Sequence, residues 1–233
     1  MNTKIFLDTA QLPIMRVWPA GGTIAGFTTN PTLMRAAGVV DYLSFVEDAV
    51  AVADGRPISF EVIADDPAEM LRQARLLARF GPNVYVKIPV TDTYGVSTFG
   101  VVRALAFEGI RVNVTAVFTS SQAADVRRAL ATCNTPAIVS IFAGRIADTG
   151  RDPTPILARA LELFAEQPQT EILWASSREL LNVQQAAAVG VHIITVAPEL
   201  LAKTGLTGKN LTEFSLETVR MFARDARAAG YVL

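Results

Sequence analysis

The chain has 233 residues, 51% of them hydrophobic and 18% charged, a net charge of −1 and a mean hydropathy of +0.33. This length can bury a sizeable core, and the apolar balance hints at further burial between subunits. The near-neutral charge favours neither nucleic acid nor an anionic membrane as partner. One cysteine, Cys133, excludes an intramolecular disulfide. The N-terminal "MNTKIFLDTA" has no signal-peptide pattern, and no apolar run is long enough to span a bilayer, so we expect a cytoplasmic protein.

Short apolar, β-branched runs recur along the whole chain and predict eight strands. Helix-period segments separate them. One example is residues 66–80, where Asp66 and Pro67 indicate a helix start and Gly81-Pro82 an end. The predicted strands cover residues 3–8, 23–29, 57–64, 83–90, 110–118, 136–142, 170–176 and 191–197.

Eight strands that alternate with helices are typical of a single (β/α)8 TIM barrel, an α/β fold; a doubly wound open sheet is the main alternative. Open parallel sheets are covered on both faces and read as continuous apolar runs. Here several strands have one aliphatic face and one partly polar face, which favours a barrel with a polar mouth. We therefore predict one barrel domain over residues 1–233, with residues 199–233 as a C-terminal helical extension.

Lys87 lies in the middle of the predicted strand "NVYVKIPV". Tyr85, Lys87 and Pro89 share one face of that strand, while Val84, Val86 and Ile88 share the other. If the lysine face looks into a barrel, burial disfavours the charged amine, and a neutral amine is a nucleophile toward carbonyl groups. The alternative is a structural lysine whose ammonium reaches the strand end or pairs with a carboxylate.

Two carboxylates occupy comparable positions. Asp8 ends the first predicted strand, and Glu61 lies inside the third, in "ISFEVIA". Buried ionisable groups are costly unless they pair or take part in chemistry. The structural alternatives are that Asp8 caps a following helix turn and that Glu61 forms a static ion pair with Lys87.

Two loops after predicted strands combine polar residues with helix-start signals. In "TTNPTLM", Asn30 and Pro31 have the pattern of an N-cap and a first helical residue. In "WASSRELL", Ser176 and Glu179 have capping-box spacing. The second loop follows the seventh strand, where barrels often bind phosphate, and Arg178 could add a bidentate clamp.

Together these residues resemble the transaldolase family, in particular its short-chain branch that includes fructose 6-phosphate aldolase. The resemblance runs from about Phe6 to Pro198 and rests on "FLDTA", "GFTTNPTLM", "FEV", "VYVKIPVT", "NVTAVF", "SIFAGRIADTG" and "ASSRE".

The resemblance implies a class I mechanism that needs no metal or cofactor, acting on sugar phosphates. Lys87 would form an imine with a ketose, Asp8 would exchange the proton of the C4 hydroxyl, and Glu61 and Thr115 would hold a proton-shuttling water. Further family-like positions would bind substrate hydroxyls, shape the site or bind phosphate: Asn30, Asn113, Ser140, Thr28, Ser176, Arg178 and Arg145.

Glu61 and Phe142 resemble the transaldolase type; aldolases of this branch have glutamine and tyrosine there. The resemblance therefore implies transfer of a dihydroxyacetone unit to an aldose, rather than its release. It also implies a homo-oligomer, a pentamer or decamer, with the last helix on a neighbouring subunit. Two segments depart from the family pattern: the long connection after Lys87, which includes Tyr94, and the C-terminal tail. They leave open whether the acceptor is erythrose 4-phosphate, the usual acceptor of the family, or another aldose.

The remaining residues add no competing site. No His/Asp/Glu cluster predicts a metal centre, and no Gly-rich dinucleotide fingerprint follows the first strand. His192, the only histidine, is expected to be a hydrogen-bonded structural residue. A non-catalytic sugar-phosphate-binding barrel remains the alternative of a different class.

Overall fold

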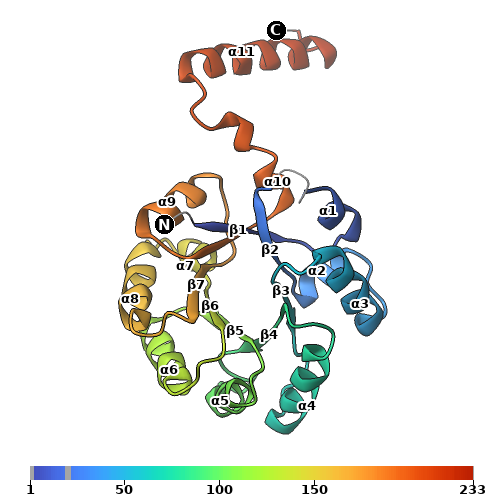
Figure 1. Cartoon of the computed structure of the whole chain (residues 1–233). Coiled ribbons are helices and arrows are strands. Elements are labelled where there is room, and N and C mark those ends of the chain that lie inside the picture. Colours follow the sequence, from blue (N-terminus) through green and yellow to red (C-terminus); the bar gives the residue numbers. More distant parts are fainter. Residues whose placement is uncertain (1–2, 19–21, 233) are drawn as a thin grey trace.

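The computed structural model describes residues 3–18 and 22–232, and its strands close into a parallel eight-stranded barrel (Figure 1). Each strand pairs with the next, and the last pairs with the first. The predicted barrel is confirmed, and the open sheet was the wrong alternative. The strands are β1 (Lys4–Asp8), β2 (Ile24–Thr28), β3 (Ile58–Glu61), β4 (Val84–Pro89), β5 (Val112–Val117), β6 (Ala137–Ile141), β7 (Thr170–Trp174) and β8 (Ile193–Val196).

Helices follow the strands and surround the barrel (Figure 1). The helix expected over residues 66–80 begins as predicted: Asp66 accepts a hydrogen bond from the Glu69 N–H, with Pro67 at the first helical position. It ends at Ala78, just before the predicted end. The helices are α1 (Leu12–Val17), α2 (Pro31–Ala36), α3 (Tyr42–Ala53), α4 (Pro67–Ala78), α5 (Phe99–Phe107), α6 (Ser120–Leu130), α7 (Ala143–Ala147), α8 (Thr154–Phe164), α9 (Leu181–Val189), α10 (Pro198–Leu201) and α11 (Leu211–Ala228), with a 3-10 turn at Thr204–Leu206.

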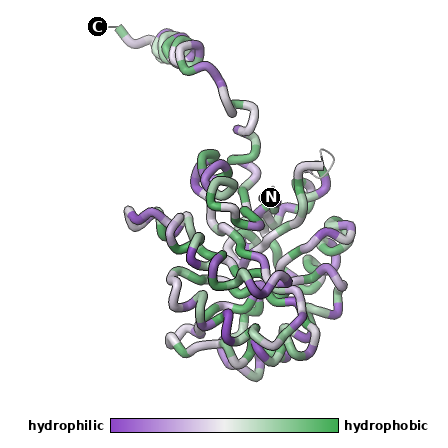
Figure 2. The backbone as a smooth tube through the Cα atoms, turned by 60° about the vertical axis from the view of Figure 1, so that its left-hand side comes forward, coloured by the Kyte–Doolittle hydropathy of each residue, from purple (hydrophilic) through white to green (hydrophobic). Residues whose placement is uncertain are grey.

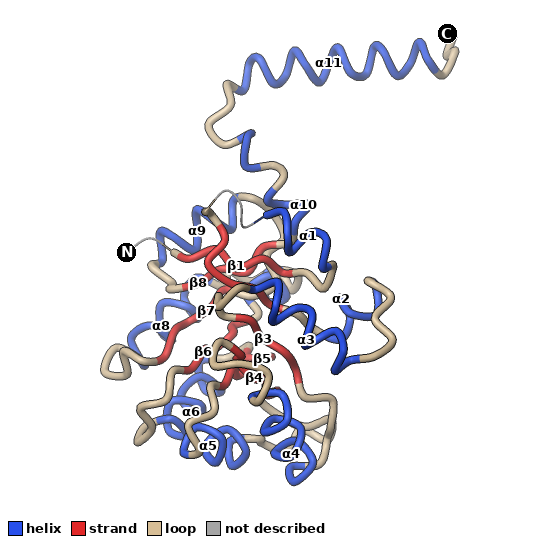
Figure 3. Tube along the Cα trace, turned by 45° about the vertical axis from the view of Figure 1, so that its right-hand side comes forward, coloured by secondary structure: helices blue, strands red, loops and turns tan. Residues whose placement is uncertain are grey.

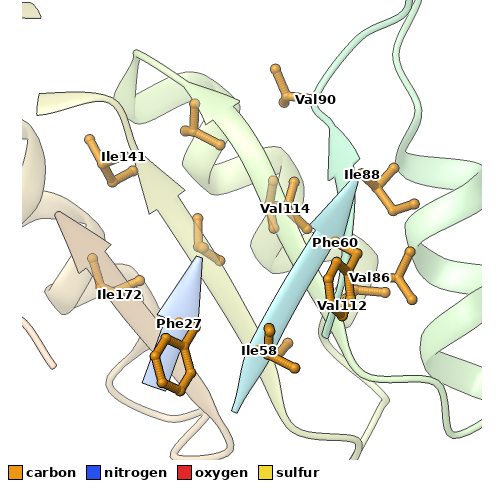
Figure 4. Close-up of a cluster of buried hydrophobic side chains, with 14 of the residues drawn as sticks. Phe27, Ile58, Phe60, Val86, Ile88, Val90, Val112, Val114, Ile141 and Ile172 are labelled. Carbon is orange, nitrogen blue, oxygen red and sulfur yellow. The ribbon is translucent and has the colours of Figure 1, made fainter. Parts of the chain in front are cut away.

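The outward and inward faces of the strands pack into two different hydrophobic clusters. Val86 and Ile88 point outward into the large cluster between strands and helices, which Figure 4 shows in close-up. Tyr85 points inward, where a small apolar layer with Phe6 and other side chains fills the lower barrel. Gly26 makes room for that layer, because a Cβ there would lie 2.6 Å from the Phe6 ring. The alternation predicted for β4 is confirmed.

The helix α11 projects away from the barrel (Figures 1 and 3). Apolar and polar residues alternate along it (Figure 2), and none of its described residues is buried. Leu211 is 81% exposed and Phe222 is 62% exposed. The predicted C-terminal helical extension is therefore present, with an apolar surface that its own barrel leaves uncovered. Within the described residues, no helix is both long and apolar enough to cross a membrane.

Candidate active site

A cavity of about 450 Å³ opens at the carboxyl ends of the strands, the end where barrel enzymes carry out their chemistry. All but two of the residues singled out from the sequence line it: Asp8, Thr28, Asn30, Glu61, Lys87, Thr115, Ser140, Phe142, Arg145 and Ser176. Asn113 and Arg178 are not among the lining residues. Thr195 of β8 was missed, although it lies on the inward face of its strand. Strand parity alone could have found it.

Lys87 lies inside the barrel and is 6% exposed. Its Nζ donates to the carbonyl oxygen of Thr29 at 2.9 Å and lies 3.3 Å from Oε2 of Glu61. The pairing of β3 with β4 places Glu61 directly opposite Lys87, so the contact follows from strand register. The ion pair considered from the sequence is present, and both its members face the cavity.

Asp8 stands at the end of β1 and accepts a hydrogen bond from the Thr28 hydroxyl at 2.7 Å. Thr28 in turn is hydrogen-bonded to Thr195. Burial raises the pKa of Asp8, an effect that the charge of Lys87 and the bond from Thr28 only partly offset. The N-cap of α1 is Gln11, so the alternative role of Asp8 as a helix cap is wrong.

Asn113 of β5 is fully buried and is not among the residues that line the cavity. Its Nδ2 donates to the Ser59 hydroxyl at 3.0 Å, and its Oδ1 accepts from the Ser140 hydroxyl at 2.7 Å. Ser140 lines the cavity, so one of the two partners of the Asn113 amide faces it. The substrate contact expected for Asn113 stays a prediction; in this structure its Oδ1 is the hydrogen-bond partner of the Ser140 hydroxyl.

Thr115 and Ala116 form a strained edge of the cavity. The Thr115 hydroxyl is buried and has no hydrogen-bond partner among the described residues. Ala116 has a φ of 59°, where the pairing of β5 with β6 shifts register. A left-handed non-glycine residue costs free energy and is typical of functional sites.

Phe142 and Arg145 share one side of the mouth. The Arg145 guanidinium lies over the Phe142 ring, 5.4 Å from the ring centroid. The ring centroids of Phe118 and Phe142 are 5.6 Å apart. Arg145 is exposed and lines the cavity, so its charge faces the space that a ligand would enter.

The loop after β7 differs from its prediction. Helix α9 begins only at Leu181, and the Asn182 side chain accepts from the N–H groups of Arg178 and Glu179 at 2.7 and 3.1 Å. The capping box expected at Ser176 and Glu179 is therefore wrong. Ser176 has a left-handed φ of 65°, so it cannot serve as the extended N-cap of that motif.

The Arg178 side chain turns toward Asp148, with Nη2 at 2.7 Å from Oδ2. Asp148 was not singled out from the sequence. Asn30, by contrast, has both features considered for it: its side chain accepts from the Leu33 N–H at 3.0 Å as the N-cap of α2, and it lines the cavity.

A second cavity of about 440 Å³ lies at the opposite, amino end of the strands and contains none of the expected site residues. His192 lines it, and its Nδ1 accepts from the Ile172 N–H at 2.9 Å. The hydrogen bond predicted for this histidine is confirmed. Among residues 3–18 and 22–232, no cluster of three His, Cys, Asp or Glu side chains could hold a metal ion.

Comparisons with known proteins identify the family of the chain. Residues 5–232 match the family model described as "Transaldolase/Fructose-6-phosphate aldolase". A "Probable transaldolase" of Thermoanaerobacter sp. is 39% identical over 97% of this chain and 98% of its own. One of Dehalococcoides mccartyi is 38% identical over 85% of this chain and 88% of its own.

Among solved structures, 3-hexulose-6-phosphate synthase from Salmonella typhimurium superposes with a TM-score of 0.55 at 17% identity, covering 84% of this chain and 89% of that one. That likeness concerns the barrel fold alone. The family match and the curated relatives go further, because they span nearly the whole chain. The chain belongs to the transaldolase/fructose-6-phosphate aldolase family.

Proposed function

We propose that this protein is a class I transaldolase, which moves a dihydroxyacetone unit from a ketose phosphate to an aldose acceptor through an imine at Lys87. The observation that carries the proposal is a buried lysine on a cavity wall, with Glu61 3.3 Å from its Nζ and Asp8 lining the same cavity. A primary amine, a proton acceptor beside it and a second carboxylate are the groups that imine chemistry requires.

Imine formation begins when Lys87 gives up a proton to Glu61 or to water and its nitrogen adds to the C2 carbonyl. The carbinolamine then loses water, a step that needs a proton donor near the oxygen. Thr115 supplies an unpartnered hydroxyl on the same wall. Glu61 and Thr115 together would hold the water that carries this proton.

Carbon–carbon cleavage then needs one base. Asp8 would take the proton of the C4 hydroxyl, the C3–C4 bond would break toward the iminium, and the product aldehyde would leave an enamine on Lys87. The acceptor aldehyde would reverse these steps, with Asp8 returning the proton. Thr28 orients the Asp8 carboxylate through its 2.7 Å bond.

The remaining lining residues would bind the substrate. Ser140, held by Asn113, can bond a substrate hydroxyl, as can Asn30. Arg145, Ser176 and Arg178 would bind the phosphate, and Arg145 and Ser176 line the cavity. Phe142 presents no hydroxyl to activate water, which favours keeping the three-carbon unit until an acceptor arrives.

The uncovered apolar side of α11 supports a partner as well. We propose that this helix packs on a second copy of the chain in a homo-oligomer, a pentamer or decamer as the resemblance implies. Phe214, Met221 and Phe222 recur at spacings of one helical face and are 39–62% exposed.

Reductive trapping tests the enzyme. Borohydride added with fructose 6-phosphate is expected to attach a reduced three-carbon adduct at Lys87, located by peptide mass, and Lys87→Met is expected to abolish both adduct and transfer. Met keeps the length of the side chain without the amine. A Lys87→Met protein with full transfer activity would refute the mechanism, and an unmodified wild-type chain would favour the non-catalytic barrel. Free dihydroxyacetone released without acceptor would favour the aldolase.

A further inference from the structure

Side chains from three neighbouring strands form a row of hydrogen bonds inside the barrel. Asp8 ends β1 and is paired in the sheet with Thr28 of β2. Thr195 belongs to β8, which pairs with the other edge of β1. The Thr28 hydroxyl is hydrogen-bonded both to Asp8 and to Thr195. The two threonine hydroxyls therefore meet across the inner face of β1, next to the carboxylate.

The direction of these hydrogen bonds follows from the charge of Asp8. An ionised carboxylate only accepts hydrogen bonds, so the Thr28 hydroxyl donates its single proton to Asp8, across 2.7 Å. Thr28 then has no proton left for Thr195, and the donor between the two threonines must be Thr195. The row thus runs from Thr195 through Thr28 to the carboxylate, and each bond in such a chain polarises the next.

Little water reaches this row. Thr28 is 3% exposed and Thr195 is 4% exposed. Phe6 and Ile193, on the inner faces of β1 and β8, belong to the apolar layer that fills the lower barrel. If the Thr195 hydroxyl were replaced by a methyl group of similar volume, Thr28 would lose a donor that water could not readily replace. Because hydrogen bonds are electrostatically stronger in such a setting than in water, the loss would act on the carboxylate.

We propose that Thr195 is a positioning residue for the base that cleavage requires: its hydroxyl donates to Thr28 and thereby commits the Thr28 hydroxyl to the Asp8 carboxylate. The inference rests on the proposed function, in which Asp8 takes the proton of the C4 hydroxyl. Thr195 lines the cavity, yet it acts through Thr28 and not on the substrate. It keeps the carboxylate oriented and favours the ionised form, which is the form that can act as a base.

Other charged groups face the same cavity and stay in place when Thr195 is replaced. They belong to Glu61 of β3, Lys87 of β4 and Arg145 of α7. Burial raises the pKa of Asp8, and the positive charge of Lys87 only partly offsets this rise. Loss of the Thr195 hydroxyl should raise the pKa of Asp8 further, because it weakens the bond by which Thr28 stabilises the anion. The acid limb of the transfer activity would then move to higher pH.

The pKa of Asp8 can be measured without a substrate. Infrared spectra of protein with isotope-labelled aspartate follow the carboxyl band that disappears in Asp8→Asn. Thr195→Val keeps the branched side chain without its hydroxyl and is expected to raise the pKa of Asp8, whereas Thr195→Ser retains the hydroxyl and should leave the pKa close to wild type. Thr170→Val is the matched control, because the buried Thr170 hydroxyl has no partner among the described residues. This control should not change the pKa of Asp8.

Kinetics test whether the row serves cleavage. Borohydride trapping with dihydroxyacetone needs the Lys87 imine but no carbon–carbon cleavage, so the Thr195 variants should be labelled like wild type. The kcat for transfer from fructose 6-phosphate should fall about three- to tenfold in Thr195→Val, which corresponds to one net hydrogen bond. The acid limb of its pH profile should move to higher pH, KM should change little, and Thr195→Ser should recover most of the rate.

Several results would overturn the inference. One is an Asp8 pKa that is the same in Thr195→Val and wild type. Another is a raised KM at unchanged kcat, which would make Thr195 a substrate contact. A loss of kcat by the same factor at every pH, or one that Thr195→Ser does not recover, would reduce Thr195 to a structural residue. Thr195→Ala, with the same expected shift, replaces Thr195→Val if that variant does not fold. A wild-type chain that gives no adduct would refute only the proposed function, because the pKa comparison still decides whether Thr195 acts on Asp8.

Discussion

Replacing Asp8 by asparagine is expected to stabilise the fold at neutral pH while removing activity. The carboxylate is held in a setting where burial raises its pKa despite Lys87 and the Thr28 bond. Folding therefore favours the protonated form. That contribution is complete below the unfolded value of 3.8 and is lost as pH rises through the higher folded pKa. At a pH above the pKa of Asp8 in both the unfolded and the folded protein, the buried carboxylate is ionised and lowers the free energy of unfolding.

The magnitude follows from linkage. Each pH unit by which folding raises the pKa costs about 1.4 kcal/mol of stability at pH 8. In a domain of this size, that corresponds to about 3–6 °C in Tm. Asparagine cannot ionise and retains an oxygen that can accept from Thr28. We therefore expect Asp8→Asn to unfold at a higher temperature at pH 8, and the difference to shrink as pH falls toward 3.8.

Thermal and urea unfolding from pH 4 to 8, at one fixed protein concentration, measures the effect, and a transfer assay runs alongside. Asp152→Asn is the matched control. The pKa of Asp152 is lowered by the backbone N–H and hydroxyl of Thr154, so its ionised form stabilises the fold. That variant should lose stability at pH 8, the opposite sign. An Asp8→Asn protein no more stable than wild type at pH 8 would show that burial does not dominate at Asp8.

Three further outcomes are expected. Phe142→Tyr should increase release of free dihydroxyacetone without acceptor, because it adds a hydroxyl to the cavity wall; unchanged release would count against the role given to Phe142. Gly144→Ala should raise KM for phosphorylated sugars at least severalfold and lower Tm, because its Cβ meets the Ser176 carbonyl 1.6 Å away; wild-type values would show that the contact can relax cheaply. Removing residues 207–233 should reduce the oligomer to smaller species in sedimentation, and an unchanged mass would exclude α11 from the interface.

The local sequence pattern was sufficient to predict the barrel and the candidate residues at the centre of the site. The alternation in β4 predicted that Lys87 shares the inner face with Tyr85, and the places of Asp8 and Glu61 in their predicted strands marked both carboxylates as candidate site residues. Such residues are placed by strand parity and register, which depend on a few neighbours and a repeat of two. The eight strands followed from the same signals.

The rim was decided only by tertiary structure. Asn113 has the parity of a lining residue, and its hydrogen bonds to Ser59 and Ser140, which come from two other strands, could not be read from the sequence. Arg178 follows a strand end as expected, and it is paired with Asp148, a carboxylate 30 positions away in the chain. Loops without a repeating pattern are set by such long-range partners. The sequence pattern therefore determines which side chains point into the barrel. The hydrogen bonds and ion pairs of the loop side chains depend on packing between segments far apart in the chain, so only the tertiary structure determines them.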